Sequence, residues 1–174
     1  MIKLILIGAG FLLILGVASV YGMSRALGKK QEWVILSPFE ATLLFKGKPL
    51  ANAKVKLHYS WNTADDEEGH TEFFRTNDKG HVSIPEVKRK IFVSSMFPTG
   101  SDYTIEVMVD SKYYLVADVV KHQPELNSEF GEPLKSVSCE VTSMDMVPTK
   151  KPNDNLIVTR CRWNGSDKFK LEEL

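Results

Sequence analysis

The sequence lacks an excess of either charge. Its 22 lysines and arginines balance its 22 aspartates and glutamates over 174 residues. Without a net positive field, nothing draws the chain electrostatically to nucleic acid or to an anionic bilayer surface. It also has no repeat of solenoid length and no low-complexity segment, apart from the acidic run Asp65–Glu68. These absences predict no nucleic-acid partner and leave an ordinary globular composition, long enough for one folded domain with appendages.

A catalytic or cofactor-binding constellation is missing as well. The four histidines are scattered, and none stands at zinc-ligand spacing from another histidine or from a cysteine: His58, His70, His81 and His122. A nucleophilic cysteine needs an adjacent histidine base, and only His122 is a plausible one. We therefore predict a protein that is not an enzyme, with no cofactor, no metal and no small-molecule substrate.

A long uncharged apolar segment opens the chain. Residues Leu4–Ser24 contain no charged side chain, with Lys3 before them and Arg25 after them. In a helix, this segment of 21 residues would span roughly 30 Å, the thickness of a bilayer core. Residues 1–27 are therefore predicted to be a transmembrane anchor that contacts the membrane through residues 4–24. A signal peptide cleaved near Val17–Ser19 is the competing interpretation.

Two arguments about the location of the domain oppose each other. Positive residues are more numerous after the apolar segment than before it, which favours a cytoplasmic domain. However, an N-terminal apolar segment followed by one large domain is typical of exported proteins, and long domains translocate largely regardless of charge. We predict an inner-membrane protein with its domain in the periplasm. A cytoplasmic domain and a cleaved, soluble periplasmic protein are the alternatives.

Short strand patterns separated by turn signals fill most of the remaining chain. The clearest lies in residues 51–60, where apolar and polar side chains alternate. We expect a linker in residues 28–35, a β-sandwich in residues 36–145, and an extension with one further strand and a tail in residues 146–174. Several short strands without a convincing soluble amphipathic helix predict an all-β fold. It would be an immunoglobulin-like or transthyretin-like β-sandwich preceded by one N-terminal transmembrane helix.

Two motifs resemble known sandwich domains. The segments GKPLANAKVKL at 47–57 and TNDKGHVSIPEV at 76–87 are similar to the repeating core of the carboxypeptidase regulatory-like and transthyretin-like domains. Together with LSP at 36–38, ELNSEFG at 125–131 and SCEV at 138–141, they also resemble a bacterial family of small domains of unknown function. Some members of that family are encoded beside toxins of contact-dependent or type VI secretion systems. The resemblance implies a β-sandwich and a candidate immunity protein whose partner is a cognate toxin.

The charged tip between the two motifs is the candidate contact surface. Neither turn chemistry nor core packing requires the acidity of its four consecutive residues, Asp65, Asp66, Glu67 and Glu68. A solvated hairpin tip and an electrostatic contact for a basic partner both fit this run. A Ca²⁺ loop does not, because such loops alternate ligands with spacers. Trp61 beside the tip, and Phe97 beside Pro98, are aromatic candidates for interface anchors.

The two cysteines, Cys139 and Cys161, could form a disulfide between the last two strands. By loop entropy, a bridge over these 22 residues is worth about 3 kcal/mol. It needs an oxidising compartment, so it would support export. Two small buried thiols are the alternative.

These observations favour a membrane-anchored, non-enzymatic module that binds another protein through the acidic tip and its aromatics. The resemblance narrows this to an immunity-type protein that binds and neutralises a secreted antibacterial toxin. A structural or accessory subunit of a bacterial envelope complex, and carbohydrate binding by the sandwich, are the alternative functions.

Overall fold

The computed structural model describes residues 28–61, 69–94, 99–143, 147–150 and 155–166. The regular structure in this part of the chain is β-strand, which confirms the all-β prediction. The strands are β1 (Gly28–Leu36), β2 (Phe39–Phe45), β3 (Lys48–Pro49), β4 (Lys54–Trp61), β5 (His70–Arg75), β6 (His81–Ile84), β7 (Val87–Ser94), β8 (Ser101–Val109), β9 (Lys112–Lys121), β10 (Val137–Glu140), β11 (Val147–Lys150), β12 (Leu156–Thr159) and β13 (Cys161–Arg162). None of the described residues belongs to a helix long and apolar enough to span a membrane. The predicted transmembrane helix falls in residues 1–27, outside the described part.

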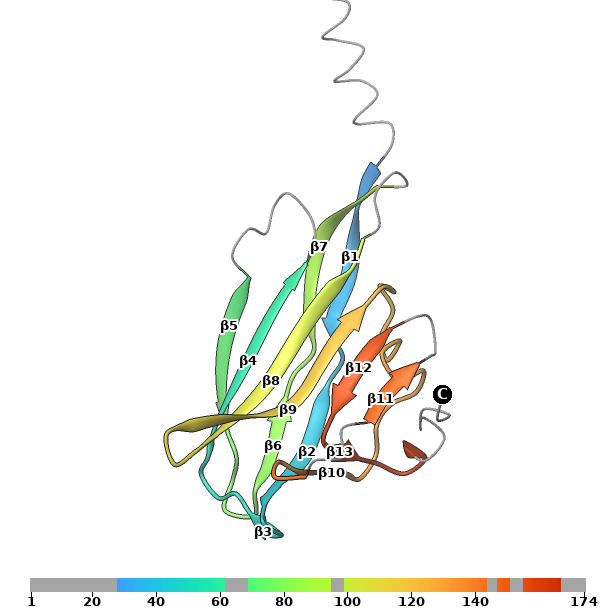
Figure 1. Cartoon of the computed structure of the whole chain (residues 1–174). Helices are drawn as coiled ribbons and strands as arrows, with labels where there is room; N and C mark the ends of the chain where they lie inside the picture. Colours follow the sequence, from blue (N-terminus) through green and yellow to red (C-terminus); the bar gives the residue numbers. More distant parts are fainter. Residues whose placement is uncertain (1–27, 62–68, 95–98, 144–146, 151–154, 167–174) are drawn as a thin grey trace, which may run out of the picture.

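One layer is a six-stranded antiparallel sheet in the order β11-β12-β9-β8-β4-β5 (Figure 1). In β4, the alternation seen in the sequence becomes an alternation of burial. Val55, Leu57 and Tyr59 are buried, and the residues between them are half-buried. Because successive side chains of a strand point to opposite faces, the sheet has one core face and one outer face.

The second layer is built around β2. This strand pairs with β6 and β3 in antiparallel fashion and with β10 in parallel fashion, and β13 pairs with β10. The two layers share one core, in which Phe45 of β2 meets Tyr114 of β9 edge to face, with ring centroids 5.5 Å apart. The fold is therefore β-sandwich-like.

A two-stranded ribbon, β1 with β7, extends the pairing of β2 with β6. Leu36 pairs with Val87, and three residues further along, Phe39 pairs with Ile84. The register is thus continuous, and it sets Pro38 opposite Pro85. Neither proline has an N–H to donate, which explains why the ladder is interrupted between the two pairs of strands.

The two sequence motifs are joined by hydrogen bonds that fix their turns. The Thr76 hydroxyl accepts the Ala53 N–H at 2.8 Å, and the Asn77 side chain accepts two N–H groups of its own turn. Gly80 has a φ of +76°, and a Cβ there would stand 2.8 Å from the Leu43 carbonyl oxygen. The motifs therefore specify the fold, and glycine is required at position 80 for both conformation and space.

Residues 28–35, predicted to be a linker, instead form most of β1. Trp33 and the apolar residues up to Leu36 are buried in the core, and the Trp33 indole N–H donates to the Ser101 hydroxyl at 3.0 Å. The polar start of the segment suggested a linker, but pairing with β7 satisfies its backbone groups.

The C-terminal extension also differs from its prediction, because it contributes three strands instead of one. β12 pairs with β9 and β13 pairs with β10, so the extension enters both layers. Ile157, Cys161 and Trp163 are buried core residues. Strands of two to four residues are too short to show a period in the sequence, which is why only one was predicted. Residues 167–174 of the predicted tail lie outside the described part.

Candidate functional site

The structure describes one of the six predicted partner-binding residues. Asp65, Asp66, Glu67, Glu68 and Phe97 lie outside the described residues. Trp61 ends β4, is 9% exposed and stacks on His70 with ring centroids 5.0 Å apart. It belongs to the core, so most of its surface is turned away from any partner. Trp61 as an interface anchor stays a prediction, and the place of its ring on the inner face of β4 is the one expected from its alternative role in core packing.

The two cysteines form a disulfide, Cys139–Cys161. They are direct partners in the antiparallel pairing of β10 with β13, and both side chains are buried. The bridge therefore attaches the end of the C-terminal extension to the sheet built around β2.

Glu140 of β10 holds the turn between β2 and β3. Lys46 and Gly47 both have positive φ, and their N–H groups donate to the Glu140 carboxylate at 3.1 and 2.7 Å. Thr142 donates its N–H, at 3.0 Å, and its hydroxyl. Partial burial raises the pKa of the Glu140 carboxyl, but the Thr142 hydroxyl and the N–H groups of Gly47, Thr142 and Lys46 outweigh it, so the net pKa is lowered.

Glu140→Gln is expected to lower the free energy of unfolding by about 1 kcal/mol at pH 7, because an amide accepts weaker hydrogen bonds than a carboxylate. Since the folded-state pKa is depressed, this stabilisation is complete above the unfolded-state pKa of about 4.3 and is lost as the pH falls through the folded-state value. Urea unfolding of both proteins at pH 7 and on acidification measures the difference. A gap that stays constant with pH would contradict this role of Glu140.

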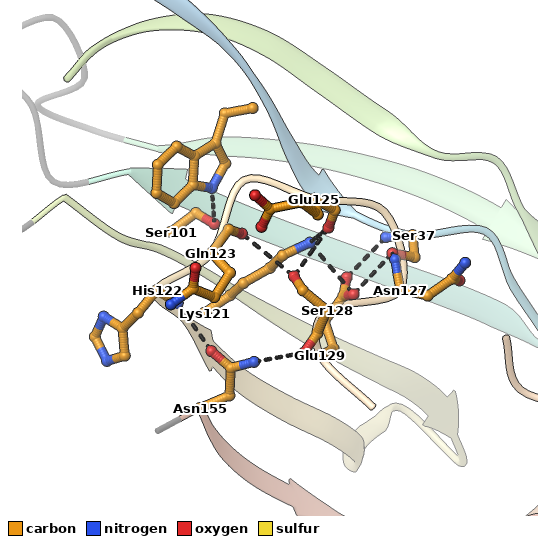
Figure 2. A network of polar contacts seen from close by, with 11 residues as sticks. Ser37, Ser101, Lys121, His122, Gln123, Glu125, Asn127, Ser128, Glu129 and Asn155 are labelled. Carbon is orange, nitrogen blue, oxygen red and sulfur yellow. Dashed lines mark hydrogen bonds and ion pairs between the residues drawn. The ribbon is translucent and has the colours of Figure 1, made fainter. Parts of the chain in front are cut away.

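A buried polar network joins the loop after β9 to both layers (Figure 2). Lys121 and Glu129 are fully buried, with Nζ 3.3 Å from Oε2. The Glu129 carboxylate also accepts the Ser37 N–H at 2.9 Å and the Ser37 hydroxyl at 2.7 Å. Lys121 donates to the Glu125 carbonyl at 2.9 Å. Asn155 bridges the His122 N–H and the Ser128 carbonyl. The conformation of the ELNSEFG segment, residues 125–131, therefore depends on the buried carboxylate of Glu129.

The charges of this network act within the core. Burial lowers the pKa of Lys121, against the opposing effect of the Glu129 carboxylate. Burial also raises the pKa of Tyr103 well above its usual value, and the negative charge of Glu129 raises it further. Because Lys121 and Glu129 have no exposed surface, the pair stabilises the loop and offers no surface to a ligand.

The outer face of the six-stranded sheet presents a cluster of aromatic rings and lysines. Phe73 on β5 is 54% exposed and Tyr113 on β9 is 37% exposed. Lys54 Nζ lies 3.8 Å from the Phe73 ring centroid, and Lys56 Nζ lies 5.5 Å from the Tyr113 ring centroid. Lys56 also pairs with Glu106 at 3.1 Å. We call these five residues the lysine–aromatic face; they lie on β5, β4, β8 and β9, which are consecutive in the sheet (Figure 1).

Neither Phe73 nor Tyr113 was predicted from the sequence as a candidate, although each belongs to an aromatic doublet. Neighbouring residues of a strand point to opposite faces, so one ring of a doublet must face outward when the other is in the core. Tyr114 packs inward against Phe45, and Tyr113 faces outward. Phe74 packs against the core, which leaves Phe73 outside.

A groove of about 350 Å³ opens beside this face, lined by Lys112–Leu115, by residues 141–143 and by Arg160. Tyr113 therefore belongs to both surfaces. Within the described part of the chain, the charged residues that line the groove are Lys112 and Arg160, and both are cationic. One guanidinium nitrogen of Arg160 donates to the Val141 carbonyl. Its buried Nε has no hydrogen-bond acceptor among the described residues.

Metal chemistry has no support in the part of the chain that the structure describes. No group of three or more His, Cys, Asp or Glu side chains there could hold a metal ion. Among the described residues, the lysine–aromatic face presents exposed rings beside lysines, and the groove is lined by two cations.

Comparison with known proteins gives one match. The model of a family described as Domain of unknown function (DUF6795) matches residues 39–144, more than half of the chain. No curated protein matches the chain, and no solved structure does. The matched span runs from the start of β2 to the turn after β10. It includes Lys121, Glu129 and the lysine–aromatic face, and it leaves out β1, Cys161 and Arg160.

Proposed function

We propose a protein-binding function for this chain, which belongs to the family described as Domain of unknown function (DUF6795). The chain would be a membrane-anchored, non-enzymatic module of the immunity type, which binds and neutralises a secreted antibacterial toxin of a type VI or contact-dependent system. The observation that carries protein binding is the lysine–aromatic face. The toxin as partner rests on the resemblance of the sequence motifs.

The composition of the face supports a protein partner. Exposed aromatic side chains are enriched among the residues that dominate binding energy at protein interfaces. Phe73 and Tyr113 are held by lysines over or beside their rings, so little side-chain entropy would be lost on binding. A sheet face of this kind offers contact area to a protein surface.

The charges of this face indicate the complementary partner. Its three charged residues are Lys54, Lys56 and Glu106, and Glu106 is already paired with Lys56. The face therefore carries excess positive charge and would attract an acidic patch. The acidic run Asp65–Glu68, which connects β4 to β5 in the sequence, would meet a basic region of the same partner.

An exported location is part of the proposal. The disulfide Cys139–Cys161 persists in an oxidising compartment, which the periplasm provides. The apolar residues 4–24 would anchor the chain in the inner membrane, and Gly28, where β1 begins, follows them closely. A domain so near the bilayer would meet a toxin as it arrives at the membrane.

We also propose that the sandwich is of the immunoglobulin-like or transthyretin-like type. Support comes from the resemblance of the two sequence motifs to those domains and from the parallel pairing of β10 with β2. This assignment concerns the fold and adds nothing to the functional argument.

Phe73→Ala is expected to weaken partner binding about 30-fold, the effect of losing an interface hot spot worth about 2 kcal/mol. The full chain is co-expressed with the product of the neighbouring gene, their co-purification is scored, and the affinity is measured by titration. Because the ring is exposed, the variant should unfold at the same urea concentration as the parent chain.

Leu126→Ala is the matched control, since Leu126 is 49% exposed and lies in the loop after β9, away from the face. It should leave binding unchanged. Failure of the neighbouring product to co-purify, with no protection of cells that express it, would remove the immunity proposal. Equal binding by the Phe73 variant and the parent would remove the face from it.

A further inference from the structure

The groove beside the lysine–aromatic face has the charge and the donors of a carboxylate site. Lys112 and Arg160 supply two positive charges, and no acidic side chain is among the described residues that line it. Glu140 is close in sequence to the lining residue Thr142, but it is occupied by hydrogen bonds from Lys46, Gly47 and Thr142. An anion entering the groove would therefore meet no unbalanced negative charge among the lining residues.

Arg160 gives the second observation. Its backbone N–H donates to Val116 at 3.0 Å, and one terminal nitrogen donates to Val141, so the side chain is held in place. Its Nε is buried and has no acceptor within the described residues. A buried donor on a charged group without an acceptor costs free energy, and a negative charge placed beside the guanidinium in the groove would offset part of that cost electrostatically.

The walls of the groove add an apolar requirement. Residues 113–115 are among those that line it, and Lys112 Nζ lies 5.5 Å from the Tyr114 ring centroid. A volume of about 350 Å³ is at the small end of ligand sites and suits a group the size of one amino-acid residue. A carboxylate with an apolar body would satisfy both the cations and the rings.

We propose that this groove binds a carboxylate carried by the protein partner, either its C-terminal carboxylate or an aspartate or glutamate side chain. The inference rests on the proposed protein-binding function and names the chemistry that its site recognises. The Arg160 guanidinium and the Lys112 ammonium bind the carboxylate, and the Tyr114 ring beside Lys112 contacts the apolar part of the same residue.

Titration of the full chain in detergent micelles tests this, with backbone amide NMR signals of residues 113 and 142 as the readout. N-acetyl-phenylalanine represents a C-terminal carboxylate, N-acetyl-glutamate α-amide represents a side-chain carboxylate, and N-acetyl-phenylalaninamide is the neutral control. We expect saturable shifts with at least one of the two carboxylates, at a Kd on the order of 1 mM. The neutral amide should give none. The carboxylate that binds more tightly identifies the source.

Lys112→Gln should weaken the carboxylate about threefold, the effect of one exposed charge, and Arg160→Lys about tenfold, the effect of one charge-assisted hydrogen bond. Lys79→Gln, at an exposed lysine in the turn between β5 and β6, is the control and should change nothing. Equal shifts with the neutral amide, no shifts with either acid, or unchanged affinity in Lys112→Gln would each overturn the carboxylate site. Those results would leave co-purification and the Phe73 test untouched, so the two proposals fail separately.

Discussion

Lys121→Met is expected to lower the free energy of unfolding by about 3–5 kcal/mol. The substitution removes the ammonium that lies 3.3 Å from Glu129, in a site where neither side chain has exposed surface. The carboxylate that remains would be buried without a compensating charge. Its hydrogen bonds from Ser37 would persist, but they replace only part of the lost interaction.

Lys56→Met is the matched control for this loss. Lys56 and Glu106 are as close, at 3.1 Å, but their side chains are 32% and 27% exposed. Water screens such a pair, and its removal should cost about 1 kcal/mol or less. Urea unfolding monitored by tryptophan fluorescence measures both variants. Equal losses in the free energy of unfolding would show that burial does not increase the contribution of the Lys121–Glu129 pair to stability.

The double variant Lys121→Met with Glu129→Gln separates charge from packing. No net charge stays buried in it, and the glutamine oxygen can still accept a hydrogen bond from Ser37. We expect its free energy of unfolding to be well above the value obtained by adding the losses measured for Lys121→Met and for Glu129→Gln alone. Strict additivity of the two substitutions would mean that Lys121 and Glu129 act independently.

Loss of the disulfide is the second large effect, and it should cost about 3 kcal/mol of stability. The bridge closes a loop with a sequence separation of 22 residues, and loop entropy sets the magnitude in the chain-entropy account. Since Cys139 and Cys161 are buried, the protein should be unfolded in reductant and refolded before the urea titration. Cys139→Ala with Cys161→Ala should be destabilised similarly and should not respond to reductant. Identical curves for the oxidised and reduced parent chain would contradict the prediction.

The redox state of the Cys139–Cys161 disulfide also tests the proposed periplasmic location. Thiol alkylation before and after reduction, on chain taken directly from cells, measures the bonded fraction. A largely bonded population is expected for a domain exported to an oxidising compartment. Free thiols in most molecules would argue for the cytoplasmic alternative.

Local sequence patterns predicted the parts of the fold that depend on neighbouring residues. The alternation in residues 51–60 correctly predicted which side chains of β4 face the core. β1 was mistaken for a linker because its first residues are polar, and only pairing with β7 makes them a strand. Likewise, β11 to β13 are too short to show a period, and their place in the two layers depends on partners elsewhere in the chain.

The sequence by itself determined an all-β chain with an apolar N-terminal segment, balanced charge and two turn motifs, because composition, period and turn chemistry are local properties. Only the tertiary structure decided which polar residues are buried and which aromatics are exposed. Glu129 stands in a polar loop, yet a partner 92 residues away in sequence, Ser37, and Lys121 enclose it. Strand pairings that join distant segments likewise leave Phe73 exposed on the sheet and place Arg160 at the groove. Such pairings are set by the balance of core packing over the whole domain, which no single stretch of sequence contains.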